Sequence, residues 1–167
     1  MRTVKIENKE TIESIIKACK ICFIGMIDLE GDPYVLPMNF AYHEGVVYLH
    51  SAPDGGLVDI INNNKKVCIT FNDGEELVHQ HPNVACSYRM KSRSVVCKGE
   101  VSFIDDLDEK REILNLMMQH YVGKEFSYSE PALRNVKIWA VPCDQITAKE
   151  FAAAHEKPNI IIKGKTK

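Results

Sequence analysis

The chain has 167 residues, 45% of them hydrophobic and 26% charged, which are the proportions of an ordinary globular domain with a sizeable core. Its formal net charge of −2 gives no electrostatic reason to expect nucleic acid or an anionic membrane as a partner. No apolar run reaches the roughly 18 residues of a membrane span. The N-terminal MRTVKIENKE lacks the apolar centre of a signal peptide, so we expect a cytoplasmic protein.

Helical periodicity occurs in three places along the chain. In residues 8–20, apolar side chains recur at positions 12, 15, 16 and 19, and Asn8 is the predicted N-cap. A short helix is predicted around residues 57–61, because the three asparagines at 62–64 favour helix termination. The third helix is predicted over residues 106–121, with apolar side chains at 113, 114, 117 and 118 on its buried face.

Strand-like segments fill most of the remaining sequence. Their predicted ranges are 22–28, 34–43, 46–51, 67–72, 85–104 (as one bent strand or two), 136–143 and 146–151. Pro37 cannot donate to a strand ladder, so it predicts an edge position or a bulge. Residues 73–83 are polar and are predicted to be irregular.

Short turns join most of these strands, which leaves no room for the helical crossovers of a parallel sheet. Six or more antiparallel strands bury their inner faces best by closing on themselves. The predicted fold class is therefore mainly β with flanking helices, arranged as an antiparallel barrel. We expect one domain over residues 1–167, with a core of about 10–151 and a flexible tail over 152–167.

The most informative stretch is PYVLPMNFAYHEGVVYLHSAPDGGL, residues 33–57, which reads as two strands of a hairpin followed by a Gly-rich turn that opens a helix. The free N–H groups of a helix start attract phosphate. Ser51 adds a hydroxyl, and Gly55 and Gly56 allow close approach of the backbone. This order predicts a site for a phosphorylated, flat, amphipathic ligand.

Three further groups of residues leave alternatives open. Arg89, Lys91 and Arg93 alternate along a strand, and three like charges on one face require either an anion or solvent opposite them. Cys19 and Cys22 form a CxxC pair without a second pair of matching spacing, so we expect no metal site there. The imidazoles of His79 and His81 could chelate a metal, although the polar sequence around them favours a loop.

Three segments resemble one known family. PYVLPMNFAY, VVYLHSAPDGG and YRMKSRSVVCKGEVSFIDDLDEKREILNLMMQHY are similar to the nitroimidazole-resistance (Nim-type) branch of the pyridoxamine 5′-phosphate oxidase-like flavoproteins, and the resemblance covers about residues 10–150. It implies an antiparallel split β-barrel of the FMN-binding type, a homodimer, and FMN bound between the two subunits. It also implies reduction of the drug's nitro group to an amine.

The resemblance assigns roles to individual residues. By analogy, the implied cofactor-binding residues are Pro37, Met38, Asn39 and Phe40 along the flavin, His50, Ser51, Ala52, Gly55 and Gly56 around the phosphate turn, Arg93 and Ser94, and Trp139 near the cleft. His50 is also the implied catalytic residue. The family turn usually carries a Lys, whereas residues 55–58 have none, so Arg93 is the expected replacement cation. From the residues alone, core packing for Trp139 and solvent for Arg93 remain open.

These observations predict a flavin-dependent reductase that acts on a small electron-poor acceptor, with FMN as cofactor and FAD as a second option. The alternative of another class is a non-catalytic module that binds flavin or haem. A third reading is a metal-binding domain that uses His79 and His81.

Overall fold

The computed structural model describes residues 2–154 of the chain. The strands are β1 (Arg2–Ile6), β2 (Cys22–Ile27), β3 (Pro33–Met38), β4 (Ala41–His43), β5 (Val46–Ser51), β6 (Lys66–Val78), β7 (Arg89–Glu100), β8 (Ser102–Ile104), β9 (Lys137–Pro142) and β10 (Gln145–Ala153). The helices are α1 (Lys9–Ala18), α2 (Gly56–Asn63), α3 (Leu107–Val122) and α4 (Glu130–Arg134), with a short 3-10 helix at Ala85–Ser87. No helix in this part of the chain is both long and apolar enough to cross a membrane.

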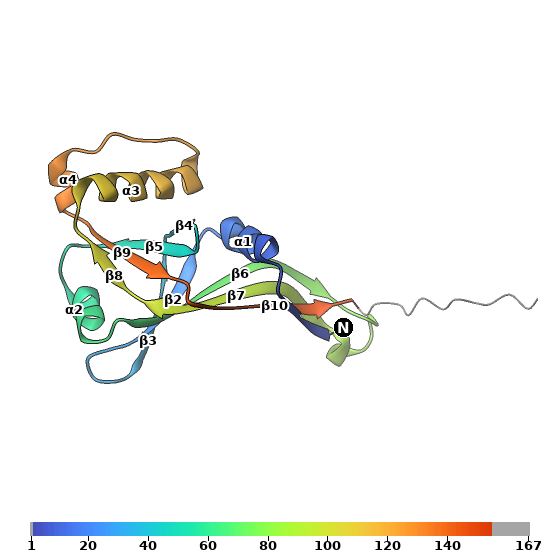
Figure 1. The fold of residues 1–167 in the computed structure, drawn as a ribbon. Helices are drawn as coiled ribbons and strands as arrows, with labels where there is room; N and C mark the ends of the chain where they lie inside the picture. Colours follow the sequence, from blue (N-terminus) through green and yellow to red (C-terminus); the bar gives the residue numbers. More distant parts are fainter. Residues whose placement is uncertain (1, 155–167) are drawn as a thin grey trace, which may run out of the picture.

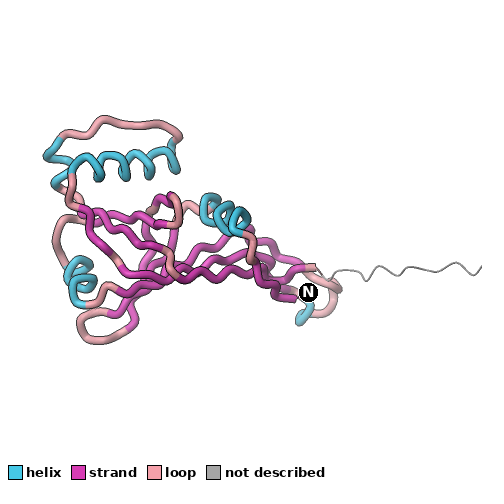
Figure 2. Tube along the Cα trace, viewed as in Figure 1, coloured by secondary structure: helices cyan, strands magenta, loops and turns pink. Residues whose placement is uncertain are grey.

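The strands form two sheets (Figures 1 and 2). One has six strands in the order β1-β10-β7-β6-β2-β3, and the other has four in the order β4-β5-β9-β8. Neighbouring strands are antiparallel throughout, which confirms the antiparallel, mainly β part of the predicted fold class. Within residues 2–154 no strand of one sheet pairs with a strand of the other, so the predicted closure into a barrel is not observed.

The single strand predicted over residues 34–43 is two strands in different sheets. β3 ends at Met38 in the six-stranded sheet, and β4 begins at Ala41 in the other. Between them, the buried Phe40 donates its backbone N–H to the hydroxyl of Tyr121, 2.9 Å away. A hydrogen bond to a residue distant in the sequence therefore replaces strand pairing at Phe40. The edge position predicted from Pro37 is confirmed, because β3 is the last strand of its sheet.

Other predicted boundaries are also wrong. β6 continues to Val78, although residues 73–83 were expected to be irregular, because Asp73 lies opposite Arg93 and Glu76 opposite Lys91 in β7. These opposite charges on neighbouring strands offset one another in a strand whose polar sequence is typical of a loop. β10 runs through the buried residues 152 and 153, beyond the core boundary expected at 151. The rest of the expected tail, from residue 155, lies outside the described residues.

α1 and α3 each begin after a residue whose side chain caps the helix. The side chain of Asn8 accepts a hydrogen bond from the backbone N–H of Thr11 at 2.7 Å, which confirms it as the N-cap of α1. Asp106 caps α3 in the same way, and Gly123 ends that helix with a φ of 68°. α3 packs on the outer face of the four-stranded sheet, where Ile113 and Met117 are buried.

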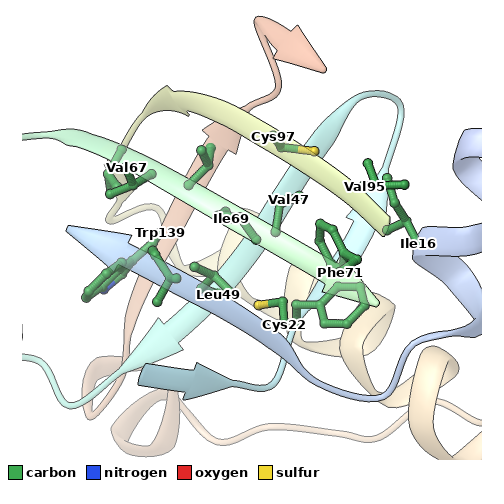
Figure 3. Packing of buried hydrophobic residues seen from close by; sticks show 14 of the residues in the cluster. Ile16, Cys22, Val47, Leu49, Val67, Ile69, Phe71, Val95, Cys97 and Trp139 are labelled. Atoms are coloured by element: carbon green, nitrogen blue, oxygen red, sulfur yellow. The ribbon is translucent and has the colours of Figure 1, made fainter. Parts of the chain in front are cut away.

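The main core lies between the two sheets (Figure 3). Strand alternation points one side of every inner strand into this layer. Trp139 and Leu49 enter it from the four-stranded sheet, while Ile69 and Phe71 enter from β6, and all four are fully buried. Cys97 is also buried there and behaves as a small hydrophobe.

The two sheets approach each other closely at Gly99 in β7. A Cβ atom at this position would lie 2.1 Å from the carbonyl oxygen of Pro142 in β9. We therefore predict that Gly99→Ala lowers the free energy of unfolding by about 2–3 kcal/mol, because the two backbones must separate. Urea unfolding followed by circular dichroism measures the change.

Gly56→Ala is the matched control. Gly56 is the first residue of α2, and nothing lies within 4 Å of the Cβ that alanine would add there. We expect a change below about 1 kcal/mol, in the stabilising direction. Equal effects of the two substitutions would contradict the close approach at Gly99.

Candidate functional site

The hydroxyl of Ser51 is held in place at the end of β5. The indole Nε1–H of Trp139 donates to Ser51 Oγ at 3.0 Å, and Oγ donates to the carbonyl oxygen of Ala52 at 2.8 Å. Trp139 itself is fully buried, so within the protomer it reaches the site only through Ser51. Within the protomer the indole thus packs in the core and bonds the hydroxyl of Ser51.

The turn after Ser51 opens α2 with an uncapped end. Gly55 occupies the N-cap with a φ of 108°, a conformation that favours glycine, and no side chain caps the helix. The space where Cβ atoms of Gly55 and Gly56 would lie is open. The first N–H groups of α2 are thus approachable by an anion. Asp54 and Asp59 place negative charge beside this turn, which opposes that attraction.

His50 carries the one buried side-chain polar atom without a hydrogen bond in residues 2–154, its Nδ1. Such orphaned atoms are rare in native proteins and mark places where a ligand can complete the bonding. Burial lowers the pKa of His50 below its ordinary value, because the cation would lose solvation without gaining a partner. The imidazole is therefore neutral at pH 7.

His50 and Ser51 point to opposite faces of the four-stranded sheet. Leu49 faces the core between the sheets, whereas Tyr48 packs in the smaller cluster beneath α3. By strand alternation His50 lies on the α3 side and Ser51 on the core side. A single ligand that contacts both must pass around the end of β5.

The four residues expected along the flavin differ in accessibility. Pro37 and Asn39 are exposed, and Met38 is partly buried. Phe40 is fully buried, with its ring 4.9 Å from the ring of Phe71. In the protomer, Pro37 and Asn39 are thus the two of this group that a ligand reaches most directly.

Arg93 and Ser94 do not lie with the turn in the protomer. The guanidinium of Arg93 bonds the carboxylate of Asp73, and Glu150 is its other cross-strand neighbour. These contacts are in the six-stranded sheet towards the β6–β7 loop, whereas Ser51 ends β5 in the other sheet (Figure 1). Internal ion pairing therefore accounts for Arg93 within one chain.

The cysteine pair and the two histidines that were considered as metal ligands are each accounted for by burial or by neighbouring residues. Burial raises the pKa of Cys19 to about 11 and that of Cys22 to about 12, so both thiols are protonated at neutral pH. The ring of His79 stacks on Tyr88 at 4.7 Å, and Nδ1 of His81 accepts from the backbone N–H of Asn83 at 3.2 Å. In the described part of the chain, no group of three or more His, Cys, Asp or Glu could hold a metal ion.

Sequence reasoning missed two cations near the turn. Lys137 is the cross-strand partner of Ser51, and Lys110 is a buried residue near the start of α3. Nothing in the sequence links Lys137 to Ser51, because only the β5–β9 pairing brings them together. Lys110 did leave a signal: it precedes Ile113 and Leu114 by three and four residues, on the apolar stripe of its helix.

The same fold occurs in proteins of low sequence identity. The flavocytochrome Anf3 from Azotobacter vinelandii is 19% identical with a TM-score of 0.78, covering 93% of this chain and 72% of its own. The FAD and heme binding protein from Mycobacterium smegmatis is 12% identical with a TM-score of 0.80, covering 92% and 76%. A search of curated proteins found no match. These likenesses define the chain as a protein of this antiparallel β class.

A closer relative and a family model narrow the class. A structure from Bacteroides thetaiotaomicron, described as a candidate 5-nitroimidazole antibiotic resistance protein, is 52% identical with a TM-score of 0.82, covering 89% of this chain and 87% of its own. Residues 8–150 match the family model described as pyridoxamine 5′-phosphate oxidase. The chain therefore belongs to the pyridoxamine 5′-phosphate oxidase-like family, in its nitroimidazole-resistance branch.

The neutral state of His50 predicts a pH effect on stability. Because folding lowers its pKa, the unfolded chain binds this proton more readily, and stability is lost as the pH falls through about 6.5, the unfolded value. We expect His50→Gln to lose less free energy of unfolding between pH 7.5 and 5.5 than the wild type. Urea unfolding at both pH values measures the difference. The pKa of His120 is also lowered by burial, so a smaller dependence should persist in the variant. Identical losses would contradict this assignment.

Proposed function

We propose that this protein is an FMN-dependent reductase of small electron-poor acceptors, with 5-nitroimidazole-type compounds among them. The observation that carries the proposal is the 52% identity to the Bacteroides thetaiotaomicron protein described as a candidate 5-nitroimidazole antibiotic resistance protein. Membership of the pyridoxamine 5′-phosphate oxidase-like family supports a flavin as cofactor. Two packed antiparallel sheets are, in this proposal, the two halves of a split barrel.

The turn after β5 supplies groups that suit a flavin phosphate. Ser51 Oγ is fixed by its two hydrogen bonds, and the open space over Gly55 and Gly56 lets an anion approach the start of α2. Asp54 weakens this attraction, so the phosphate needs a cation from another element.

When bound, the flavin supplies electron transfer to the acceptor. The chain's own contribution is centred on His50. Its neutral imidazole carries a buried Nδ1 with no partner, which can donate a hydrogen bond to an acceptor oxygen when it holds the proton. Because burial lowers its pKa, the imidazole stays neutral near pH 7, and a proton that it takes up is readily passed on. His50 thus orients the acceptor and handles a proton at Nδ1.

We also propose that the protein is a homodimer that uses the outer face of the six-stranded sheet. Phe23, Ile27 and Val35 are 49%, 40% and 63% exposed, and strand pairing places them on one face together with Pro37. A contiguous apolar face on an open sheet indicates an interaction site. A second copy on this face would lie against Pro37, one of the residues expected along the flavin.

Val35→Glu tests this dimer. A charge at the centre of the apolar face should convert the dimer to a monomer, because the carboxylate would be buried without a partner. Analytical ultracentrifugation measures the mass. The control is Val122→Glu, since Val122 is 52% exposed at the end of α3, away from this face. A wild-type monomer, or a dimer that survives Val35→Glu, would refute the proposed interface.

The reductase proposal is tested with FMN-loaded protein reduced under anaerobic conditions. Mixing with 2-methyl-5-nitroimidazole should reoxidise the flavin, as followed by its visible absorption. His50→Ala should slow this step by about 100-fold while FMN affinity and thermal stability are retained. His43→Ala is the control, because His43 is an exposed histidine at the end of β4. Unchanged turnover in His50→Ala would remove His50 from the mechanism.

A non-catalytic flavin- or haem-binding protein is the second candidate. The acidic residues Asp54 and Asp59 beside the turn, and the absence of a Lys in residues 55–58, favour this reading. The absorption spectrum of the purified protein separates the cases. Two broad bands indicate flavin, a Soret band indicates haem, and chromatography of the released flavin distinguishes FMN from FAD.

A further inference from the structure

A cavity of about 350 Å³ lies beside the turn that follows β5. Its lining residues are Pro53 from the turn, Asp105, Leu107 and Lys110 around the start of α3, and Arg134, Val136 and Lys137 from the end of α4 to the start of β9. The four-stranded sheet ends here, because β5 and β8 stop and β9 begins at this edge. Strand ends and two helix ends therefore enclose one hollow.

The lining of this cavity is electropositive. Three cations and one carboxylate leave a formal excess of two positive charges. Nζ of Lys137 lies 3.2 Å from Asp105 Oδ1, so one cation is partly neutralised. Arg134 pairs with Glu130 at 3.2 Å, but both side chains are about two-thirds exposed, and such a surface pair is weak enough to rearrange.

The ammonium group of Lys110 is buried, so its positive charge is held at a fixed position beside the cavity. It is only 5% exposed, and its Nζ donates to the carbonyl oxygens of Val136 at 2.8 Å and Leu133 at 3.3 Å. Two of its three N–H bonds are thus used. No carboxylate of residues 2–154 lies within ion-pair distance of it. A buried ammonium without a counter-charge is costly, and an anion in the adjoining cavity would offset that cost.

We propose that this cavity binds a phosphate group through Lys137 and Arg134, with Lys110 supplying positive potential behind them. Arginine and lysine are the side chains that bind phosphate best, and the arginine can do so with two N–H groups at once. The phosphate has two sources: the flavin's own, in which case Lys137 supplies the cation missing from residues 55–58, or a separate phosphorylated ligand. The site stands on its own cations and does not require the reductase activity.

Titration of the full chain with inorganic phosphate in a calorimeter tests the site. Lys137→Gln and Asp105→Asn remove the same ion pair but change the cavity charge in opposite directions. We expect Lys137→Gln to weaken phosphate binding about fivefold and Asp105→Asn to tighten it about threefold, both at low salt. Lys149→Gln, which removes an exposed charge on β10, should leave binding unchanged.

The opposite effects expected for Lys137→Gln and Asp105→Asn distinguish a phosphate site from an ion pair that acts only on stability. If the ion pair acts only on stability, the two variants will shift phosphate binding in the same direction, and the proposal fails. It also fails if wild-type protein binds no phosphate, because Lys110 then serves solely to bond the carbonyl groups at the end of α4.

Flavin fluorescence identifies the source of the phosphate. If Lys137→Gln weakens the binding of FMN but not that of riboflavin, the cavity holds the flavin's own phosphate. If FMN affinity is unchanged and FMN-loaded protein still binds inorganic phosphate, the ligand is separate. If the protein binds no flavin, and Lys137→Gln and Asp105→Asn still change phosphate affinity in opposite directions, the phosphate site is supported. The same result would refute FMN as the cofactor.

Discussion

The inner faces of the two sheets bury one another, and the rest of the molecule is arranged around that contact. The core residues between them come from both sheets, and β7 passes close to the backbone of β9 at Gly99. This packing uses only the inner face of the six-stranded sheet. Its outer face keeps exposed apolar side chains such as Val35, a cost that a second subunit would remove.

The same contact fixes the positions of the strand ends where the candidate site lies. Trp139 is held in the core and in turn holds the hydroxyl of Ser51, so a buried aromatic ring positions a partly exposed polar group. The turn and α2 continue directly from that point. A site on rigid strand ends keeps its geometry better than one on a long loop. His50, on the other face of β5, is fixed by the same strand.

Local signals in the sequence predicted the elements better than their assembly. The N-cap of α1, the helix expected over residues 106–121, the hairpin of β4 and β5, and the edge position of Pro37 each depend on a few neighbouring residues, and all are confirmed. The break at Phe40 and the polar extension of β6 depend on Tyr121 and on the charges of β7, which lie far away in the sequence. Local patterns carry no information about such partners.

The candidate site shows the same division. The turn from Ser51 to Gly56 was predicted from residue types, and the structure places it at a strand end as expected. The pairing of Ser51 with Lys137 and the burial of Lys110 follow from topology alone. The ion pair of Arg93 with Asp73 likewise could not be read from an alternating run of basic residues.

The chain contains one tryptophan, and that indole bonds to Ser51 while lying in the core. Its ultraviolet emission depends on the polarity and hydrogen bonding around the ring. Any event that pulls on the serine hydroxyl should therefore change the colour or intensity of this light before the protein unfolds. Trp139 is therefore an intrinsic fluorescent probe of the turn: its N–H bonds to Ser51, while its ring is shielded from water.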